Sequence, residues 1–355
     1  MDSIYLGVMK FYKKLAGFFL FLLLAPAVIA CTRVVYHGPN DTVLTGRTMD
    51  FSVEIPANIW VFPQGMLRHG AAGPHSISWT STYGSVVTSS WDLASSDGMN
   101  EKGLVANLLW LVESEYPDFD PESGTPGLSI SMWAQYALDQ FATVAEAVAA
   151  FRKEEFVVVS DFIAGTDKFA TLHLSLSDAG GDSAILEYID GKLEIHHDAA
   201  YNVMTNSPPF RDQLAIARYW EDVPPSAFLP GSNRAADRFV RAQTFIRAVV
   251  QSDDPTISVA SVFSVIRNVS VPYGISVEGH PNLSTTRWRV VADQKHLRYF
   301  YESALTPNAF WIDFEKLNFA EDQPVRVLPL SQRETYSGEA SSHLVARDPF
   351  DFQGL

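Results

Sequence analysis

The stretch "AVIACT" at residues 27–32 sets the frame for the whole chain, because it holds Cys31, the single cysteine among 355 residues. One thiol cannot form an internal disulfide, so a hydrophobic core alone must hold the fold together. Hydrophobic residues make up 47% of the sequence and aromatic residues 12%, which is enough for a large core. We therefore predict one large domain, or two close ones, without disulfides.

The residues before Cys31 have the pattern of an export signal. Three lysines precede the apolar run "LAGFFLFLLLAPAVIA" at residues 15–30, which is short for a membrane span and ends in small residues. Cleavage before Cys31 would leave a mature chain that begins with cysteine. We predict a signal peptide at residues 1–30 and an exported protein, either periplasmic or secreted.

The charge of the chain narrows the class of partner. The formal charge is −15, and residues 1–30 carry one acidic and three basic residues, so the mature chain has −15 − 2 = −17. Such a charge repels nucleic acid and anionic membrane surfaces. We expect a small-molecule substrate and no nucleic-acid partner, and no membrane partner unless Cys31 carries a lipid.

Hydrophobic periodicity alternates between strand and helix patterns. Short alternating runs separated by turn residues predict antiparallel strands within 31–110, 169–206 and 287–313. Apolar stripes at helical spacing predict helices between these blocks, the first with a capping box at Thr143 and Glu146. The predicted helices cover residues 130–151, 209–221, 235–251 and 256–267. This order predicts an α+β fold of two antiparallel sheets with helices on their outer faces.

Two segments are predicted to carry no chemistry. Residues 331–355 are polar and unpatterned, so we predict a loosely held C-terminal tail after a folded region at 31–330.

His196 and His197 lie in a predicted strand, where neighbouring side chains point to opposite faces. We therefore predict no metal site at this pair, and no cofactor motif occurs elsewhere.

Two chemical roles are open to Cys31, and its position in the sequence favours neither of them. As the first mature residue it would carry a free α-amine beside its thiol, and that amine can take the thiol proton for nucleophilic attack. The tetrapeptide "VIAC" at 28–31 also fits a lipobox, in which the cysteine sulfur receives a lipid. A thioether sulfur cannot attack a carbonyl, so this alternative would make the protein a lipid-anchored binding lipoprotein.

The motif "GRTMD" at residues 46–50 favours the first interpretation. A strand returning beside the one that follows Cys31 would bring Arg47 and Asp50 to the thiol. The carboxylate could hold the α-amine and the guanidinium could stabilise a thiolate. The alternative for this pair is an exposed ion pair at a strand end, which contributes little to stability.

Several motifs in one order resemble the choloylglycine hydrolase family of N-terminal cysteine hydrolases, which contains penicillin V acylases and conjugated bile-salt hydrolases. The motifs are "CTRV", "GRTMDF", "SSDGMNEKGLVANLLWL", "YNVMTNSPPF" and "LPGSNRAADRFVRA", and the likeness runs from Cys31 to about residue 315. The resemblance implies a four-layer αββα Ntn-hydrolase sandwich. It also implies hydrolysis of a linear amide through an acyl-thioester, without cofactor or metal.

The resemblance also assigns roles to individual residues. It implies that Cys31 is the nucleophile, that Arg47 and Asp50 assist it, and that Arg238 in "DRFVR" belongs to the same site. It places Asn206 of "TNSP" as a donor to the oxyanion, a task that suits a neutral amide. Taken alone, Asn206 would be a turn residue before proline and Arg238 a solvated helix residue.

Trp110 marks a departure within the family. It stands where bile-salt hydrolases have a second oxyanion-hole asparagine, so a backbone N–H would supply the second donor. The aromatic residue resembles the Gram-negative branch, whose members cleave penicillin V and long-chain acyl homoserine lactones, the latter a quorum-quenching activity. A conjugated bile salt is the alternative substrate. Trp110 is expected to line the acyl pocket, and a short segment between Asn206 and Arg238 leaves the oligomeric state open, a homo-oligomer included.

Overall fold

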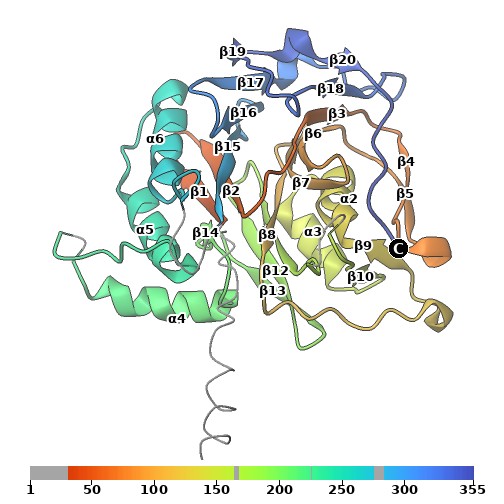
Figure 1. Ribbon diagram of the computed structural model, residues 1–355, viewed down its shortest axis with the longest axis horizontal. Helices are drawn as coiled ribbons and strands as arrows, with labels where there is room; N and C mark the ends of the chain where they lie inside the picture. Colours follow the sequence, from red (N-terminus) through yellow and green to blue (C-terminus); the bar gives the residue numbers. More distant parts are fainter. Residues whose placement is uncertain (1–30, 164–167, 225, 276–283) are drawn as a thin grey trace, which may run out of the picture.

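The structure is a computed structural model that describes residues 31–163, 168–224, 226–275 and 284–355. The predicted signal peptide at residues 1–30 lies outside the described residues. Two large sheets lie face to face near the centre, with one group of helices outside each (Figure 1).

The first sheet has seven strands in the order β14-β1-β2-β15-β16-β17-β19. All pairs in it are antiparallel except β17 with β19. Its strands are β1 (Thr32–His37), β2 (Val43–Phe51), β14 (Val203–Met204), β15 (Thr285–Asp293), β16 (Arg298–Ser303), β17 (Ala309–Asp313) and β19 (Gly338–Glu339).

The second sheet has nine strands in the order β13-β12-β11-β8-β7-β6-β3-β18-β20, all antiparallel. Its strands are β3 (Ile59–Phe62), β6 (Ser85–Ser90), β7 (Ala94–Asn100), β8 (Val105–Trp110), β11 (Leu172–Ser177), β12 (Ser183–Ile189), β13 (Lys192–His197), β18 (Arg326–Leu328) and β20 (Val345–Ala346). Two small ribbons flank it: β4 (Leu67–His69) with β5 (Ser78–Thr80), and β9 (Gly127–Ser129) with β10 (Val157–Val159).

Helices cover the outer faces of both sheets (Figure 1). The helices α5 (Ala235–Ala248) and α6 (Pro255–Asn268) pack on the first sheet, with α4 (Phe210–Glu221) beside α5. The helices α2 (Trp133–Gln140) and α3 (Val144–Phe151) pack on the second sheet, and Thr143 caps α3 by accepting from the Glu146 backbone N–H. The predicted α+β fold, a four-layer αββα sandwich of two antiparallel sheets, is confirmed.

The core follows from this layering. Strands between two layers are covered on both faces, and all nine residues of β2 are buried. One hydrophobic cluster joins α5, α6 and the first sheet to inward residues of the second, and another joins the second sheet to α2 and α3. Within the described residues, no helix is long and apolar enough to cross a membrane.

The C-terminal segment corrects one expectation. Residues 331–355 are not loosely held, because β19 pairs with β17 and β20 pairs with β18 at the edges of the two sheets. Beyond β20, the ring of Phe350 lies 5.2 Å from that of Trp60. The sequence signal failed because two-residue strands and isolated aromatic anchors leave no periodicity.

Pairing of β1 with β2 positions the start of the folded chain. Thr32 pairs with Thr48 and Arg33 with Arg47, so Cys31, directly before β1, lies beside Met49 and Asp50. Gly46 in β2 lets α6 approach closely, since a Cβ there would lie 2.6 Å from Val262 Cγ1 and 3.1 Å from Ile266 Cγ2.

We expect Gly46→Ala to lower the free energy of unfolding by about 1–3 kcal/mol, because the added methyl overpacks the contact between β2 and α6. Urea titration followed by circular dichroism measures this change. Gly231→Ala is the matched control, since a Cβ at Gly231 meets nothing within 4 Å. Equal stability of the two variants would contradict this account of Gly46.

Candidate active site

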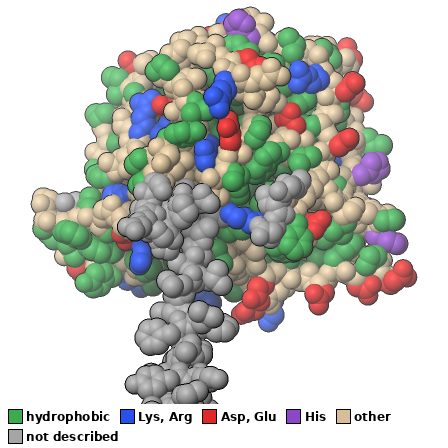
Figure 2. Space-filling model, in the orientation of Figure 1, with side chains coloured by type: hydrophobic (Ala, Val, Ile, Leu, Met, Phe, Trp, Pro, Cys, Tyr) green, Lys and Arg blue, Asp and Glu red, His purple; other side chains and the backbone are tan. Residues whose placement is uncertain are grey.

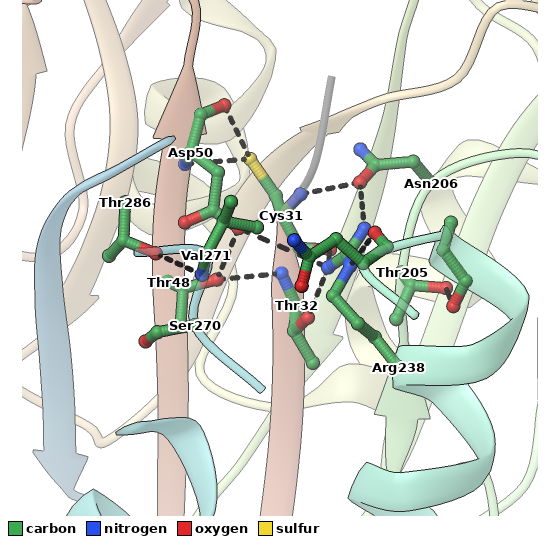
Figure 3. A network of polar contacts seen from close by, with 12 residues as sticks. Cys31, Thr32, Thr48, Asp50, Thr205, Asn206, Arg238, Ser270, Val271 and Thr286 are labelled. Carbon is green, nitrogen blue, oxygen red and sulfur yellow. Dashed lines mark hydrogen bonds and ion pairs between the residues drawn. The ribbon is translucent and has the colours of Figure 1, made fainter. Parts of the chain in front are cut away.

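The thiol of Cys31 is buried directly before β1, with the residue only 3% exposed. Its Sγ accepts from the Asp50 backbone N–H at 3.4 Å and lies 3.7 Å from the Asp50 carbonyl oxygen, to which it can donate. Both contacts use backbone atoms of β2, so the β1–β2 register sets the position of the sulfur (Figure 3).

Arg238 and Asn206 hold the backbone of Cys31 from the other side (Figure 3). Arg238 Nη1 donates to the Cys31 carbonyl oxygen at 2.7 Å and also to Thr32 Oγ1. Arg238 Nη2 donates to Asn206 Oδ1 at 2.9 Å, and the Cys31 backbone N–H donates to the same oxygen. Helix α5 and the loop after β14 therefore converge on one residue.

The Asn206 amide is oriented by its partners. Its Oδ1 accepts two hydrogen bonds, whereas its Nδ2 donates to the Trp110 carbonyl oxygen at 2.7 Å. An amide NH₂ group has two hydrogens, so one N–H is left over from this contact. The structure thus joins Asn206 both to Cys31 and to Trp110, although its role as an oxyanion donor stays a prediction.

Asp50 contacts Cys31 through its backbone, and its carboxylate is buried behind the thiol. Thr48 Oγ1 donates to Asp50 Oδ2 at 3.1 Å, and Arg238 Nη1 lies 4.0 Å from the same oxygen. Asp50 Oδ1 accepts no hydrogen bond from the described residues. Burial raises the pKa of Asp50 to about 6, even though the charge of Arg238 lowers it.

Burial also raises the pKa of the Cys31 thiol above its ordinary value. The positive charge of Arg47 lowers that pKa and the negative charge of Asp50 raises it. Since burial dominates, the surroundings keep the thiol protonated until a base takes its proton. In the full chain the Cys31 nitrogen is a peptide nitrogen and cannot act as that base.

Arg47 lies between the two sheets. Its Nη2 donates to the Leu108 carbonyl oxygen on β8 at 2.8 Å, and its guanidinium carbon lies 4.6 Å from the centre of the Trp288 ring. Its Nη1 lies 3.7 Å from Asp97 Oδ2, and both side chains are fully buried. Arg47 therefore acts on Cys31 by charge across the interior.

Asp97 is a residue of this site that the sequence interpretation missed. It accepts from the Tyr299 hydroxyl at 2.6 Å and from Asn107 Nδ2 at 2.7 Å, and it faces Arg47. Burial raises the pKa of Asp97 to about 6. The only signal was the polar strand "SSDGMN" itself, since a run of polar residues at the centre of a sheet needs internal partners.

An apolar cavity of about 120 Å³ opens beside Cys31. Trp110 lines it, and Trp91, from the tight turn between β6 and β7, places its ring 5.9 Å from that of Phe51. Seven of the apolar side chains that line the cavity come from four regions of the chain. They are Met49, Phe51, Ile55, Trp91, Leu108, Trp110 and Leu172.

Glu187 anchors the helix that follows Asn206. Both carboxylate oxygens accept from the Phe210 backbone N–H at the start of α4, at 3.1 and 3.0 Å, and His173 Nδ1 lies 2.8 Å from Oε1. From the next turn of α4, Gln213 Nε2 donates to the Asn206 carbonyl oxygen at 3.0 Å. Glu187 and Gln213 are thus positioning residues for Asn206, and no motif in the sequence identified them.

We expect Glu187→Gln to lower stability at neutral pH by about 3 kcal/mol. Burial alone would raise the pKa of Glu187, but the hydrogen bonds from His173 and from the Phe210 backbone N–H, with the His196 ring 3.6 Å from Oε2, lower it to about 2. Its ionised form therefore stabilises the fold above the unfolded pKa, and this contribution disappears as the pH falls from about 4.5 towards 2.

Urea titrations at a series of pH values test this linkage. Glu194→Gln is the matched control, because Glu194 pairs with Glu187 in the register of β12 and β13 but is one-third exposed. The wild type and the control should lose stability in acid more steeply than Glu187→Gln. Identical acid profiles for all three proteins would show that Glu187 is not the linked group.

Among the described residues, no group of three or more His, Cys, Asp or Glu side chains is arranged to hold a metal ion. In the view of Figure 2, acidic side chains are spread along the right-hand margin.

The structure brings together all five predicted polar residues with Trp110 at the same cavity. These residues are Cys31, Arg47, Asp50, Asn206 and Arg238.

Comparison with known proteins agrees with this arrangement. Residues 31–327 match the family of linear amide C–N hydrolases, choloylglycine hydrolase family. A penicillin V acylase of Pectobacterium atrosepticum is 48% identical over 351 residues, covering 92% of this chain and 93% of that protein. A bile salt hydrolase/transferase of Clostridium perfringens is 24% identical, covering 81% of this chain and 93% of that protein.

Among solved structures, too, a penicillin V acylase is more similar to this chain than a bile acid hydrolase is. The penicillin V acylase of Agrobacterium tumefaciens has a TM-score of 0.86 and 55% identity, covering 92% of this chain and 100% of that one. A conjugated bile acid hydrolase of Clostridium perfringens has a TM-score of 0.74 at 20% identity, covering 87% of this chain and 98% of that one, which shows a shared fold. The predicted closeness to penicillin V acylases is confirmed. The chain belongs to the choloylglycine hydrolase family and is a linear amide C–N hydrolase of the penicillin V acylase-like type.

Proposed function

We propose that the exported, mature protein uses Cys31 to hydrolyse amides with an apolar acyl group. The acyl group is an aryloxyacetyl group, as in penicillin V, or a fatty acyl chain, as in N-acyl homoserine lactones. The observation that carries this proposal is the thiol of Cys31 at an apolar, aromatic-lined cavity, with its backbone held by Arg238 and Asn206. Apolar pockets with few polar groups recognise such acyl chains.

The first half of the reaction forms a thioester. Removal of residues 1–30 converts the Cys31 nitrogen into an amine, which takes the thiol proton, and the thiolate attacks the amide carbonyl carbon. The remaining N–H of Asn206 and a backbone N–H stabilise the oxyanion. The C–N bond then breaks as the ammonium returns its proton to the leaving nitrogen, so an amine departs and the acyl group stays on Sγ.

The second half releases the acid. The α-amine removes a proton from water as the water oxygen attacks the thioester carbon. The C–S bond breaks, the thiolate takes the proton from the ammonium, and the free enzyme is restored. An ammonium has more N–H groups than the peptide nitrogen that now contacts Asn206, and Asp50 Oδ1 has capacity for one of them. Asp50 then orients the amine, and Arg47 and Arg238 stabilise the negative charge.

Burial of the thiol supports a free cysteine over a lipidated one. Sγ lies against both backbone groups of Asp50, and the residue is almost inaccessible. A diacylglyceryl group would have to place two fatty acyl chains in the cavity of about 120 Å³ beside this sulfur, where the acyl-thioester places one acyl group. Intact mass measurement of the protein from its producing cells distinguishes the two, because a free N-terminal cysteine supports the hydrolase and a lipid adduct supports the lipoprotein.

A substrate panel separates the acyl classes. Penicillin V, N-acyl homoserine lactones and glycine-conjugated bile salts are offered to the mature protein, and released primary amine is measured. We expect turnover of the first two and little of the third, since Trp110 occupies the position of the second asparagine implied for bile-salt hydrolases. Preferential turnover of the bile salt would overturn this choice of substrate.

We expect Cys31→Ala to fold with the stability of the wild type and to lose hydrolysis by at least about a thousand-fold, as nucleophile removal does elsewhere. Circular dichroism and urea titration check the fold, and amine release checks the activity. Ser264→Ala, an exposed change on α6, is the control that should leave both unchanged. Turnover by Cys31→Ala above about one-thousandth of the wild-type rate would contradict the mechanism.

A further inference from the structure

The described chain ends at the cavity that holds Cys31. This cavity is lined by Gln353, Gly354 and Leu355, and also by Cys31 and by Arg47 of β2. In Figure 1 the C-terminal end lies beside β4, β5 and β9, whereas β1 and β2 lie towards the centre of the molecule. The cavity thus has the thiol on one side and this segment on another. Leu355 is 62% exposed, so the segment separates part of the cavity from solvent.

Hydrogen bonds seat this segment in one position. The Gln353 carbonyl oxygen accepts from Ser129 Oγ at 2.8 Å and from Ser131 Oγ at 2.6 Å. The Gln353 backbone N–H donates to the Leu93 carbonyl oxygen at 2.8 Å, and the Leu355 N–H donates to the Ala71 carbonyl oxygen at 3.1 Å. The cavity is also lined by Leu93, Ser129 and Ser131, so the residues that hold this segment in place belong to the cavity as well.

The fit of the segment is tight enough to require glycine. A Cβ on Gly354 would lie 2.0 Å from the Ala71 carbonyl oxygen, which the backbone could not accommodate without moving. Any larger residue there would lift the segment off its seat. Gly354 is therefore selected by the close approach of two backbones.

A separate anchor holds the chain just before the wall. The Phe350 ring lies 5.2 Å from that of Trp60 and 4.6 Å from that of Phe352. The Arg68 guanidinium carbon lies 5.6 Å from the centre of the Phe352 ring. Since these contacts precede Gln353, the wall can be removed while the anchor stays in place.

We propose that Gln353–Leu355 forms a wall of the acyl pocket and limits the length of the acyl group that the enzyme accepts. The segment lies beyond residues 31–327, which match the family, so the family pattern assigns it no role. The proposal rests on the proposed function, because it takes the cavity beside Cys31 as the acyl pocket. These three residues close this side of the cavity, and an acyl chain that reached them would have to stop or displace them.

Truncation after Phe352 tests the proposal. The wild type and the truncated protein are assayed on N-acyl homoserine lactones from butanoyl to dodecanoyl, and kcat/KM is measured for each. Removal of the wall should raise the ratio of dodecanoyl to butanoyl kcat/KM by about tenfold, since each methylene newly admitted to an apolar pocket gives such a factor or more. Circular dichroism and urea titration check that the truncated protein keeps its fold, since the contacts of Phe350 and Phe352 remain.

A second variant guards against a folding defect in the truncated chain. Ser129→Ala with Ser131→Ala removes both hydroxyl donors to the Gln353 carbonyl oxygen and should shift the ratio in the same direction by a smaller factor. Ser264→Ala is the matched hydroxyl control on the exposed face of α6. An unchanged or lower ratio in both test variants overturns the proposal. A wild type that cleaves penicillin V but no member of the series contradicts the fatty acyl class of substrate instead, and one that cleaves neither contradicts the proposed function.

Discussion

The guanidinium of Arg238 is fully buried in the first turn of α5, where it touches the carbonyl of Cys31, the hydroxyl of Thr32 and the amide of Asn206. A buried cation is costly unless its donors are satisfied, so these acceptors must be in place whenever the protein is folded. One side chain thereby ties the helix layer, the first strand and the loop after β14 together. The position of the Cys31 thiol is a consequence of folding and needs no substrate to form.

A second buried cation lies between the sheets. Arg47 on β2 lies close to Asp97 on β7 and donates to Leu108 on β8, so the interior of the sandwich holds a cation, a carboxylate and a hydrogen-bonded tyrosine. Removing one member would leave the others buried without partners, which is more damaging than replacing the whole group. The Arg47 charge that lowers the thiol pKa is for this reason also part of what holds the two sheets together.

Much of the fold followed from patterns in the chain. The predicted helix at 235–251 is α5 (Ala235–Ala248), and "GRTMD" lies on the strand next to β1, as its alternation suggested. The polar strand β7 and the ordered end of the chain were missed for one reason. Hydrophobic periodicity reports only segments that bury apolar faces, whereas these are held by buried polar partners and scattered aromatic anchors.

The sequence by itself determined the chemistry that is available: one thiol at a cleavage-like boundary, a guanidinium and a carboxylate spaced along one strand, and an amide before a proline turn. Only the tertiary structure decided which groups meet. It placed Asn206 Oδ1 on the Cys31 nitrogen, it gave Glu187 and Gln213 a positioning role, and it brought Gln353 to the cavity. Local patterns carry strand and helix preference, but contacts between residues hundreds of positions apart depend on how whole layers pack.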